Sequence, residues 1–328
     1  MLTDISSGVS SMPSSQKLIS VVTASHNEEK NLENLYESVK AIFSKLPQYR
    51  YEHLFIDNAS TDNSQTILKQ LAQADKNVKV IFNTRNFGHI RSPFHGIIQA
   101  RGEAVISLVA DFQDPPEMMI DFLQKWEEGC TIVIGVKNKS EESRLMFTIR
   151  KIYYHLINRL SETPLVKNYT GFGLYDQKVI QVLRQIDDPY PYFRGLIFEL
   201  GFDFYPIFYT QRSRKRGISK NNFYSLFDMA MLGITNHSKI PLRLATMLGF
   251  VGSILCVLMA VVYFILKLIW WEKFTLGLAP ILIGFLLFSS VQLFFIGILG
   301  EYIGAIHTQV LKRPRVIESA RINFDATN

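Results

Sequence analysis

The chain has 328 residues, enough for about two domains. Apolar residues make up 48% of it, and most of the excess lies after residue 243, whereas the first two thirds have the composition of an ordinary globular domain. The formal charge of +6 indicates an anionic partner or surface, but the basic residues are dispersed except at 211–220 and 311–316, so nucleic acid is not an expected partner. The two cysteines, Cys130 and Cys256, are far apart in apolar surroundings, which supports neither a disulfide framework nor a zinc site.

Residues 1–16 are rich in serine and lack the charged start and apolar core of a signal peptide, so we expect a disordered tail. After this tail, short apolar runs alternate with helical patterns. The runs lie at residues 18–25, 51–59, 78–84, 104–111 and 131–136. Their consecutive apolar residues are typical of strands that are buried on both faces. The sequence therefore predicts an α/β fold with a mostly parallel sheet and flanking helices.

Such a sheet binds its ligands at the carboxyl ends of its strands. No Gly-x-Gly-x-x-Gly follows the first run and no Gly-Lys-Ser/Thr loop occurs in the chain, which argues against the common dinucleotide-binding and P-loop classes. Polar and acidic residues follow three of the runs instead: SHNEE at 25–29, DNASTD at 57–62 and VADFQDPPE at 109–117. Each stretch is either a helix cap, for which Asn27, Ser60 or Asp62 would serve, or part of a ligand site.

The last of these stretches allows the two roles to be separated. Asp114 precedes Pro115 and Pro116, and proline favours the first turn of a helix, so we interpret Asp114 as the cap. Asp111 and Gln113 are two residues apart on a segment that we expect to be extended, where both side chains point the same way. An oxygen from each can bind one hard cation, and Mg²⁺ or Mn²⁺ would keep open positions for phosphate oxygens.

The order of these motifs resembles that of the polyprenyl-phosphate glycosyltransferases of glycosyltransferase family 2. The resemblance rests on SHNEE, IDNASTD, RNFG, ADFQDPPE, RGISK and PLRL, followed by two apolar spans, and it extends over residues 18–312. Within the family the chain is most similar to the GtrB-type bactoprenol glucosyltransferases and is related to dolichyl-phosphate mannose synthase. The family implies a GT-A-like fold and the transfer of one sugar from a nucleotide diphosphate sugar to a lipid phosphate.

The resemblance also implies roles for single residues of the donor site. Glu28 and Asp57 correspond to positions that bind the nucleoside, and Asp111 and Gln113 correspond to the metal pair. Catalysis in the family depends on this pair, so the resemblance assigns Asp111 and Gln113 a catalytic role as well.

Basic residues take the remaining roles. Arg214, Ser219 and Lys220 fall on the diphosphate-binding segment of the family, for which a basic patch at the membrane surface is the alternative. Lys137 and Arg150 lie where the family supplies cations for the acceptor phosphate, and solvated surface charge is their alternative.

The chain departs from the family pattern at several positions. Residues 24–28 read Ala-Ser-His-Asn-Glu in place of Pro-x-Tyr-Asn-Glu, and the usual acidic pair is Asp57 and Asn58. Val109 replaces the first acid of the common Asp-Ala-Asp, and residues 170–174 read Thr-Gly-Phe-Gly-Leu in place of Gly-Asp-Phe-Arg-Leu. None of these changes removes the metal pair.

Two uncharged apolar spans follow, at residues 244–266 and 276–300, of about 23 and about 25 residues. Each is long enough to cross a bilayer core of about 30 Å, which makes a buried core helix the weaker interpretation. Lysine and arginine flank the pair on its outer sides, so the positive-inside rule predicts that the catalytic domain and both termini are cytoplasmic. We expect the aromatic segments 192–205 and 222–234 to be interfacial helices.

The expected organisation is a disordered tail at 1–16, a nucleotide-sugar-binding catalytic domain at 17–185, interfacial helices and a basic loop at 186–240, two transmembrane helices at 241–311 and a cytoplasmic tail at 312–328. The expected activity is metal-dependent, inverting transfer of one sugar, glucose from UDP-glucose by resemblance, to a polyprenyl phosphate such as undecaprenyl phosphate at the inner membrane. A mannosyl or aminosugar transferase and a catalytically inactive nucleotide-sugar or lipid-binding membrane protein are the alternatives. A Gly300-x-x-x-Gly304 pair allows a homo-oligomer.

Overall fold

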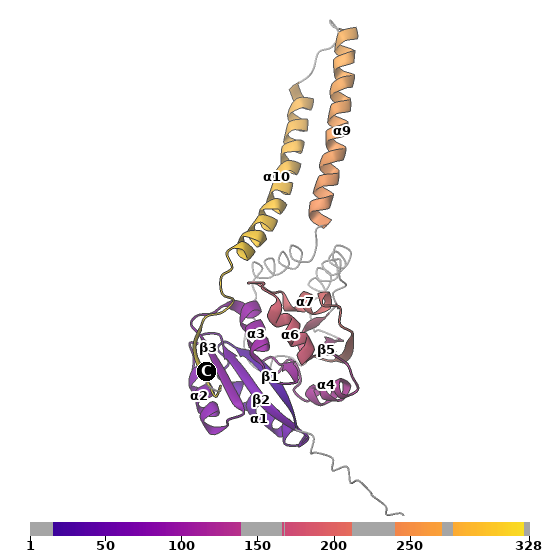
Figure 1. The fold of residues 1–328 in the computed structure, drawn as a ribbon. Coiled ribbons are helices and arrows are strands. Elements are labelled where there is room, and N and C mark those ends of the chain that lie inside the picture. Colours follow the sequence, from indigo (N-terminus) through magenta and orange to yellow (C-terminus); the bar gives the residue numbers. More distant parts are fainter. Residues whose placement is uncertain (1–15, 139–165, 167, 212–239, 271–277, 325–328) are drawn as a thin grey trace, which may run out of the picture.

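The centre of the fold is an eight-stranded sheet with the strand order β7-β5-β6-β4-β1-β2-β3-β8 (Figure 1). The computed structural model describes residues 16–138, 166, 168–211, 240–270 and 278–324. The strands are β1 (Lys17–Ser25), β2 (Tyr49–Asp57), β3 (Val78–Asn83), β4 (Ala104–Ser107), β5 (Ile132–Lys137), β6 (Tyr169–Asp176), β7 (Phe204–Tyr209) and β8 (Glu318–Ile322). The helices are α1 (Leu32–Phe43), α2 (Ser64–Ala74), α3 (Gly88–Gln99), α4 (Met118–Glu127), α6 (Gln177–Gln185), α7 (Phe193–Glu199), α9 (Ile240–Ile269) and α10 (Leu278–Val310).

The middle of the sheet is parallel. β1 pairs in parallel with β2 and β4, and β2 pairs in parallel with β3. Antiparallel pairs join β6 to β4 and β5, and β8 to β3, while β7 pairs in parallel with β5. All five predicted strands are present, and the prediction of a mostly parallel sheet with flanking helices is confirmed.

Helices cover both faces of this sheet. On one face, α1, α2 and α4 contribute Leu35, Leu68 and Phe122 to a buried cluster. On the other face, α3 and α6 contribute Phe94 and Ile180 to a second cluster. Successive residues of β1 and β2 alternate between the two clusters, which explains why these strands consist of consecutive apolar residues.

Three strands, β6, β7 and β8, go beyond the prediction. The segment 192–205, expected to be an interfacial helix, is helical only at Phe193–Glu199 and then leads into β7, so this expectation is wrong for its last residues. The aromatic and apolar residues of β7 suit a strand, and they pair with β5. The sheet therefore draws on residues after 185 as well as on the region 17–185. The expected tail at 1–15 and the expected helix at 222–234 lie outside the described residues.

Two long apolar helices, α9 and α10, project side by side from one end of the molecule (Figure 1). They cover the two predicted spans apart from residues 276–277, which lie outside the described part, and α10 continues beyond residue 300 to Val310. Many of their large side chains are exposed, for example Phe250 at 68% and Met259 at 71%. Both helices are long and apolar enough to cross a membrane, and an apolar surrounding would remove the cost of this exposure.

Candidate active site

The carboxyl ends of four parallel strands meet along one edge of the sheet. Ser25 at the end of β1 is opposite Asp57 at the end of β2, and Asp57 is opposite Phe82 near the end of β3. Just after β4, the N–H of Leu108 donates to the backbone of β1 at 2.9 Å. The loops that follow these strands therefore lie at a common edge, where a sheet of this kind binds its ligands.

Hydrogen bonds join the loops that follow β1 and β2. Asn27 has a left-handed backbone with a φ of 58°, which asparagine adopts more readily than most residues. Its N–H donates to Ser60 Oγ at 2.9 Å, and its Oδ1 accepts from the N–H of Thr61 at 2.8 Å. The N–H of Glu28 donates to Ser64 Oγ at 2.9 Å. The two loops are therefore held together as one surface.

The predicted helix caps differ in part from the observed ones. Asn27 does not cap α1, because its side chain is bonded to the neighbouring loop, and the residue before the helix is Asn31. The Asn31 side chain donates instead to Glu28 Oε2 at 2.7 Å, and Glu28 is partly exposed at the candidate site. In α2, the predicted cap Asp62 does accept from the N–H of Ser64, the first helical residue, at 3.0 Å.

Asp57 is fully buried, and its carboxylate accepts three hydrogen bonds. Oδ1 accepts from Ser60 Oγ at 2.5 Å, and Oδ2 accepts from Ser60 N–H at 3.0 Å and from Gln65 Nε2 at 3.1 Å. The carboxylate is therefore engaged by its own loop, whose shape it fixes. Direct contact between Asp57 and a nucleoside stays a prediction.

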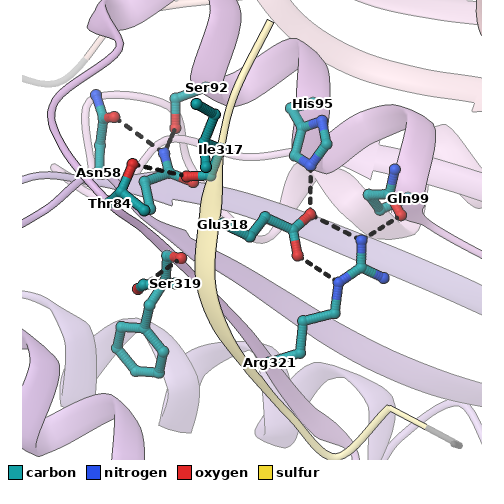
Figure 2. A network of polar contacts seen from close by, with 11 residues as sticks. Asn58, Thr84, Ser92, His95, Gln99, Ile317, Glu318, Ser319 and Arg321 are labelled. Carbon is teal, nitrogen blue, oxygen red and sulfur yellow. Dashed lines mark hydrogen bonds and ion pairs between the residues drawn. The ribbon is translucent and has the colours of Figure 1, made fainter. Parts of the chain in front are cut away.

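The next residue, Asn58, joins the loops that follow β2 and β3 (Figure 2). Its Nδ2 donates to Asn86 Oδ1 at 2.8 Å and to Gly88 O at 3.2 Å. Its Oδ1 accepts from Asn83 Nδ2 at 3.0 Å and from the N–H of Phe87 at 2.9 Å. Both donors and both acceptor positions of this buried amide are used. The sequence marked Asn58 only as a departure from the family pattern and missed this role.

Asp111 and Gln113 lie in a tight turn and not on the extended segment that was predicted. β4 ends at Ser107, and Phe112 has a φ of 56°, in the left-handed region. The N–H of Gln113 donates to Asp111 Oδ1 at 3.2 Å, which closes the turn. The prediction failed because the apolar run continues to Ala110 although the strand pairing stops earlier. Both side chains are partly exposed and within reach of a ligand.

Asp114 does not cap α4, contrary to the prediction. α4 begins at Met118, and the buried carboxylate of Asp114 accepts a hydrogen bond from the hydroxyl of Tyr209 at the end of β7. Burial raises the pKa of Asp114, and the hydrogen bond from Tyr209 opposes this effect. Burial and the neighbouring Asp114 raise the pKa of Tyr209 as well. β7 therefore holds the end of the acidic turn, a contact across 95 positions that no local pattern indicates.

Two cations lie near the acidic turn. Lys137 at the end of β5 is partly exposed. Its charge lowers the pKa of Asp114 and so opposes the effect of the burial of Asp114. Arg194 on α7 acts on Asp114 in the same direction, and the charge of Asp111 acts against both. The structure thus brings the predicted Lys137 and Asp111 together. Arg194 was missed because it lies in the segment interpreted as interfacial. The predicted residues Arg150, Arg214, Ser219 and Lys220 lie outside the described residues.

Three buried polar atoms near this edge have no hydrogen-bond partner among the described residues. They are Ser25 Oγ, His26 Nδ1 and Asn83 Oδ1. Buried polar atoms in folded proteins are nearly always paired. Ser25 and His26 lie at the end of β1, and Asn83 lies at the end of β3.

The acidic turn fits part of a magnesium or manganese site. Among the residues that the structure describes, no three His, Cys, Asp or Glu side chains are grouped so as to hold a metal. Asp111 offers a carboxylate and Gln113 an amide oxygen, which are the hard ligands that these ions prefer. Mg²⁺ commonly takes one or two protein carboxylates and completes its shell with water and substrate phosphates. The turn therefore fits a site that the substrate completes.

A mostly parallel sheet with polar loops and an acidic turn at its carboxyl edge is compatible with the resemblance seen in the sequence, and comparison with known families identifies the class of protein. The model described as "Glycosyl transferase family 2" matches residues 20–184. The chain belongs to this family.

Individual relatives extend the match over nearly the whole chain. "Bactoprenol glucosyl transferase" of Shigella phage SfII is 33% identical over 301 residues, which cover 91% of this chain and 96% of the relative. The protein of the same description from Shigella phage SfX is 32% identical over 305 residues, or 92% and 99% of the two chains. "Prophage bactoprenol glucosyl transferase homolog" of Escherichia coli K12 is 30% identical over 91% of this chain and 97% of its own. The resemblance to GtrB-type enzymes is confirmed.

Solved structures are more distant. Glucosyl-3-phosphoglycerate synthase from Mycobacterium tuberculosis, in complex with Mn²⁺, uridine diphosphate and phosphoglyceric acid, has a TM-score of 0.47 at 15% identity, over 67% of this chain and 76% of that one. S. aureus TarS in complex with UDP-GlcNAc has a TM-score of 0.42 at 16% identity, over 67% of each chain. At these scores the structures contribute no detail to the site.

The contact between Asp114 and Tyr209 makes a testable contribution to stability. We expect Tyr209→Phe to lower the free energy of unfolding by about 1–3 kcal/mol, because it leaves a buried acceptor without its donor. Tyr205→Phe is the matched control, since Tyr205 lies on the same strand with 42% of its surface exposed, and its effect should stay within about 0.5 kcal/mol. Chemical denaturation in detergent measures both. Equal effects of the two substitutions would contradict the assigned role.

Proposed function

We propose that the protein transfers one sugar, glucose from UDP-glucose, to a polyprenyl phosphate such as undecaprenyl phosphate, with inversion, at the cytoplasmic face of the membrane. The observation that carries this proposal is the acidic turn at the carboxyl edge of the sheet, which the hydrogen bond from the N–H of Gln113 to Asp111 Oδ1 closes. The positive charges of Lys137 and Arg194 act on Asp114, the buried acid that follows this turn. A site with both signs of charge suits a reaction between a diphosphate and a phosphate. Relatives described as bactoprenol glucosyl transferases, similar over more than nine tenths of the chain, support the lipid and the sugar.

The acidic turn is assigned to the donor diphosphate. Asp111 and Gln113 would hold Mg²⁺ or Mn²⁺ there, and the bound metal supplies positive charge that stabilises the leaving diphosphate. The resemblance assigns Arg214, Ser219 and Lys220 to the same diphosphate. The positive charge of Arg214 and Lys220 would act in the same direction, and the segment would help to exclude water from the reacting atoms.

The nucleoside is assigned to the ends of β1 and β2. Glu28 is partly exposed there and is oriented by Asn31. Ser25 Oγ and His26 Nδ1 are buried without a partner among the described residues, so both atoms would gain a hydrogen bond from a ligand. Asp57 is next to Ser25 in the sheet, and its contribution is to fix the shape of the loop.

The acceptor phosphate requires no general base. A phosphate monoester has a second pKa of about 6, so at neutral pH most of it is the dianion and its oxygen attacks without losing a proton. A single attack on the anomeric carbon forms the new C–O bond while the bond to the diphosphate breaks and its electron pair leaves with the diphosphate. The attack occurs opposite the leaving group, so the configuration inverts. Lys137 and, from the resemblance, Arg150 would offset the charge of the acceptor phosphate.

The two apolar helices suit a lipid acceptor and, with the family relatives, indicate a membrane-associated protein. The distribution of lysine and arginine supports a multi-pass protein of the inner membrane, with the catalytic domain and both termini in the cytoplasm. A homo-oligomer stays a prediction. Among the described residues, a Cβ built on Gly300 or Gly304 meets no atom within 4 Å, so this pair is not packed against α9.

Transfer into lipid tests the function directly. Purified protein, undecaprenyl phosphate and radiolabelled UDP-glucose should yield label that is extracted into organic solvent, whereas undecaprenol should accept none, because an alcohol requires a base. Label from GDP-mannose or from a UDP-linked aminosugar instead would identify the mannosyl or aminosugar alternative. Binding of nucleotide sugar without transfer from any donor would identify an inactive binding protein.

The metal pair is tested by removing one ligand. Asp111→Asn should lower the transfer rate by more than about 100-fold, since even the partners that orient metal ligands contribute 10–100-fold. Mn²⁺ binding, measured by calorimetry in the presence of UDP, should weaken in parallel. Asp121→Asn is the control, because Asp121 is an exposed acid on the following helix α4. Full transfer by Asp111→Asn, or activity of the wild type in excess chelator, would contradict the assignment.

The orientation is tested by cysteine labelling in a Cys130→Ser, Cys256→Ala background. Glu272→Cys, between the two apolar helices, should react with an impermeant thiol reagent added to intact cells, and Asn328→Cys should not. Both should react after lysis. The reverse pattern would place the catalytic domain outside the cytoplasm, where nucleotide sugars are not supplied.

A further inference from the structure

The chain returns to the sheet after its last apolar helix. α10 ends at Val310, and after residues 311–317 the chain forms β8, which pairs with β3 at the edge of the sheet. Figure 2 shows this segment crossing over polar side chains of α3 and of the loop that follows β3. Residues 315–319, here called the C-terminal strap, make contacts that position one part of the candidate site.

The strap first holds the start of the loop after β3. Ile317 O accepts two hydrogen bonds from Thr84, from its N–H at 3.0 Å and from its Oγ1 at 3.2 Å. Ser319 Oγ donates to Phe82 O at 3.1 Å. The pairing of β8 with β3 ends in an irregularity, where Asn83 is opposite Glu318. The strap therefore reaches the carboxyl end of β3, where the loop begins.

The strap also holds the helix into which this loop leads. Glu318 Oε1 lies 2.5 Å from His95 Nε2 on α3, and the carboxylate accepts hydrogen bonds from Nε and Nη2 of Arg321 (Figure 2). Burial alone would raise the pKa of Glu318, but the bonds from His95 and Arg321 lower it to about 2. Arg321 Nη2 donates to Gln99 Oε1, also on α3, at 2.9 Å. Both ends of the loop, Thr84 and α3, are thus fixed by adjacent residues of one segment.

Arg315 connects the strap to the other elements near the site. Its Nε donates to Asp188 O at 2.7 Å, a second hydrogen bond joins its Nη2 to Ile186 O, and its guanidinium lies 5.4 Å from the centre of the Phe94 ring on α3. The last apolar helix is therefore joined through a few residues to α3 and to the segment between α6 and α7.

We infer that the C-terminal strap is a positioning element of the donor site. It holds residues 84–88 in the shape in which Asn58 can bind them, and it joins this loop to the last apolar helix. The inference rests on the proposed function, because it takes the carboxyl edge of β1, β2 and β3 to be the donor site. Without the strap, the loop would be mobile until the donor binds. Ordering the loop would then cost free energy on binding, so donor affinity would fall. The chemical step would be little changed, since the contacts described for the strap are with β3 and the loop after it, with α3 and with the segment between α6 and α7.

The test compares two alanine substitutions at opposite ends of β8. Glu318→Ala removes the contacts with α3 at the site end of the strand. Asn323→Ala is the matched control, because Asn323 lies just beyond the other end of β8. Its Nδ2 donates to Ala72 O on α2 and to Val78 O at the start of β3. Both variants lose several hydrogen bonds, so both should lower the melting temperature. Only Glu318→Ala should weaken UDP binding to the full-length protein, by about tenfold as measured by calorimetry. The same variant should raise the KM for the donor, while kcat stays within about twofold of the wild-type value.

Hydrogen exchange supplies a readout that does not depend on activity. Amides of residues 84–95 should exchange faster in Glu318→Ala than in the wild type. Their exchange rates should be unchanged in Asn323→Ala. If the alanine variant does not fold, Glu318→Gln replaces it in the test. This substitution keeps the shape of the side chain and should show the same changes to a smaller degree. Unaltered UDP binding and unaltered hydrogen exchange in both Glu318 variants would overturn the inference about the strap and would leave the proposed function standing. Failure of the wild type to bind UDP would contradict the proposed donor, and the inference with it.

Discussion

The side-chain amide of Asn58 joins the loops that follow β2 and β3, and the shape of the carboxyl edge depends on it. A buried amide must find partners for its polar groups, and this one supplies two donors and two acceptor positions that join both loops at one point. The geometry accounts for the departure from the acidic pair that is usual in the family. An aspartate could accept from Asn83 and Phe87 but has no hydrogen to donate to Asn86 Oδ1 or Gly88 O. Asparagine is the residue whose chemistry fits this position.

The candidate site has two halves that differ in their chemistry. At the ends of β1, β2 and β3, amides, hydroxyls and the carboxylates of Asp57 and Asp62 hold the loops, and Glu28 is partly exposed among them. Beyond β4 the groups are charged: Asp111 and Asp114 lie in the acidic turn, and the charges of Lys137 and Arg194 act on Asp114. Charge of both signs in a partly buried place strengthens each interaction, because the effective dielectric constant is below that of water. The proposed reaction between two anionic groups suits this second half.

The sequence predicted those features of the fold that depend on local patterns of residues. Consecutive apolar residues marked β1 to β5, and the acidic stretches marked the edge at which the candidate site lies. β8 was missed because an exposed edge strand needs no apolar run: only Ala320 and Ile322 among its five residues are apolar. Asp114 was misread because the proline rule takes account of neighbours in sequence, whereas its partner Tyr209 comes from a strand 95 positions later. Local rules fail where a buried polar group finds its partner through the fold.

In the proposed membrane-spanning arrangement, the last apolar helix and the strap together set the height of the candidate site above the bilayer. α10 has 33 residues, so it is about 50 Å long at 1.5 Å per residue, which exceeds the bilayer core of about 30 Å. Part of α10 must therefore tilt or extend through the headgroup region, where Lys312 and Arg313 after its end suit anionic headgroups. Residues 311–317 reach at most about 25 Å before β8 begins. The carboxyl end of β3 is thereby confined near the membrane surface, which is where the phosphate of a membrane-embedded lipid is found.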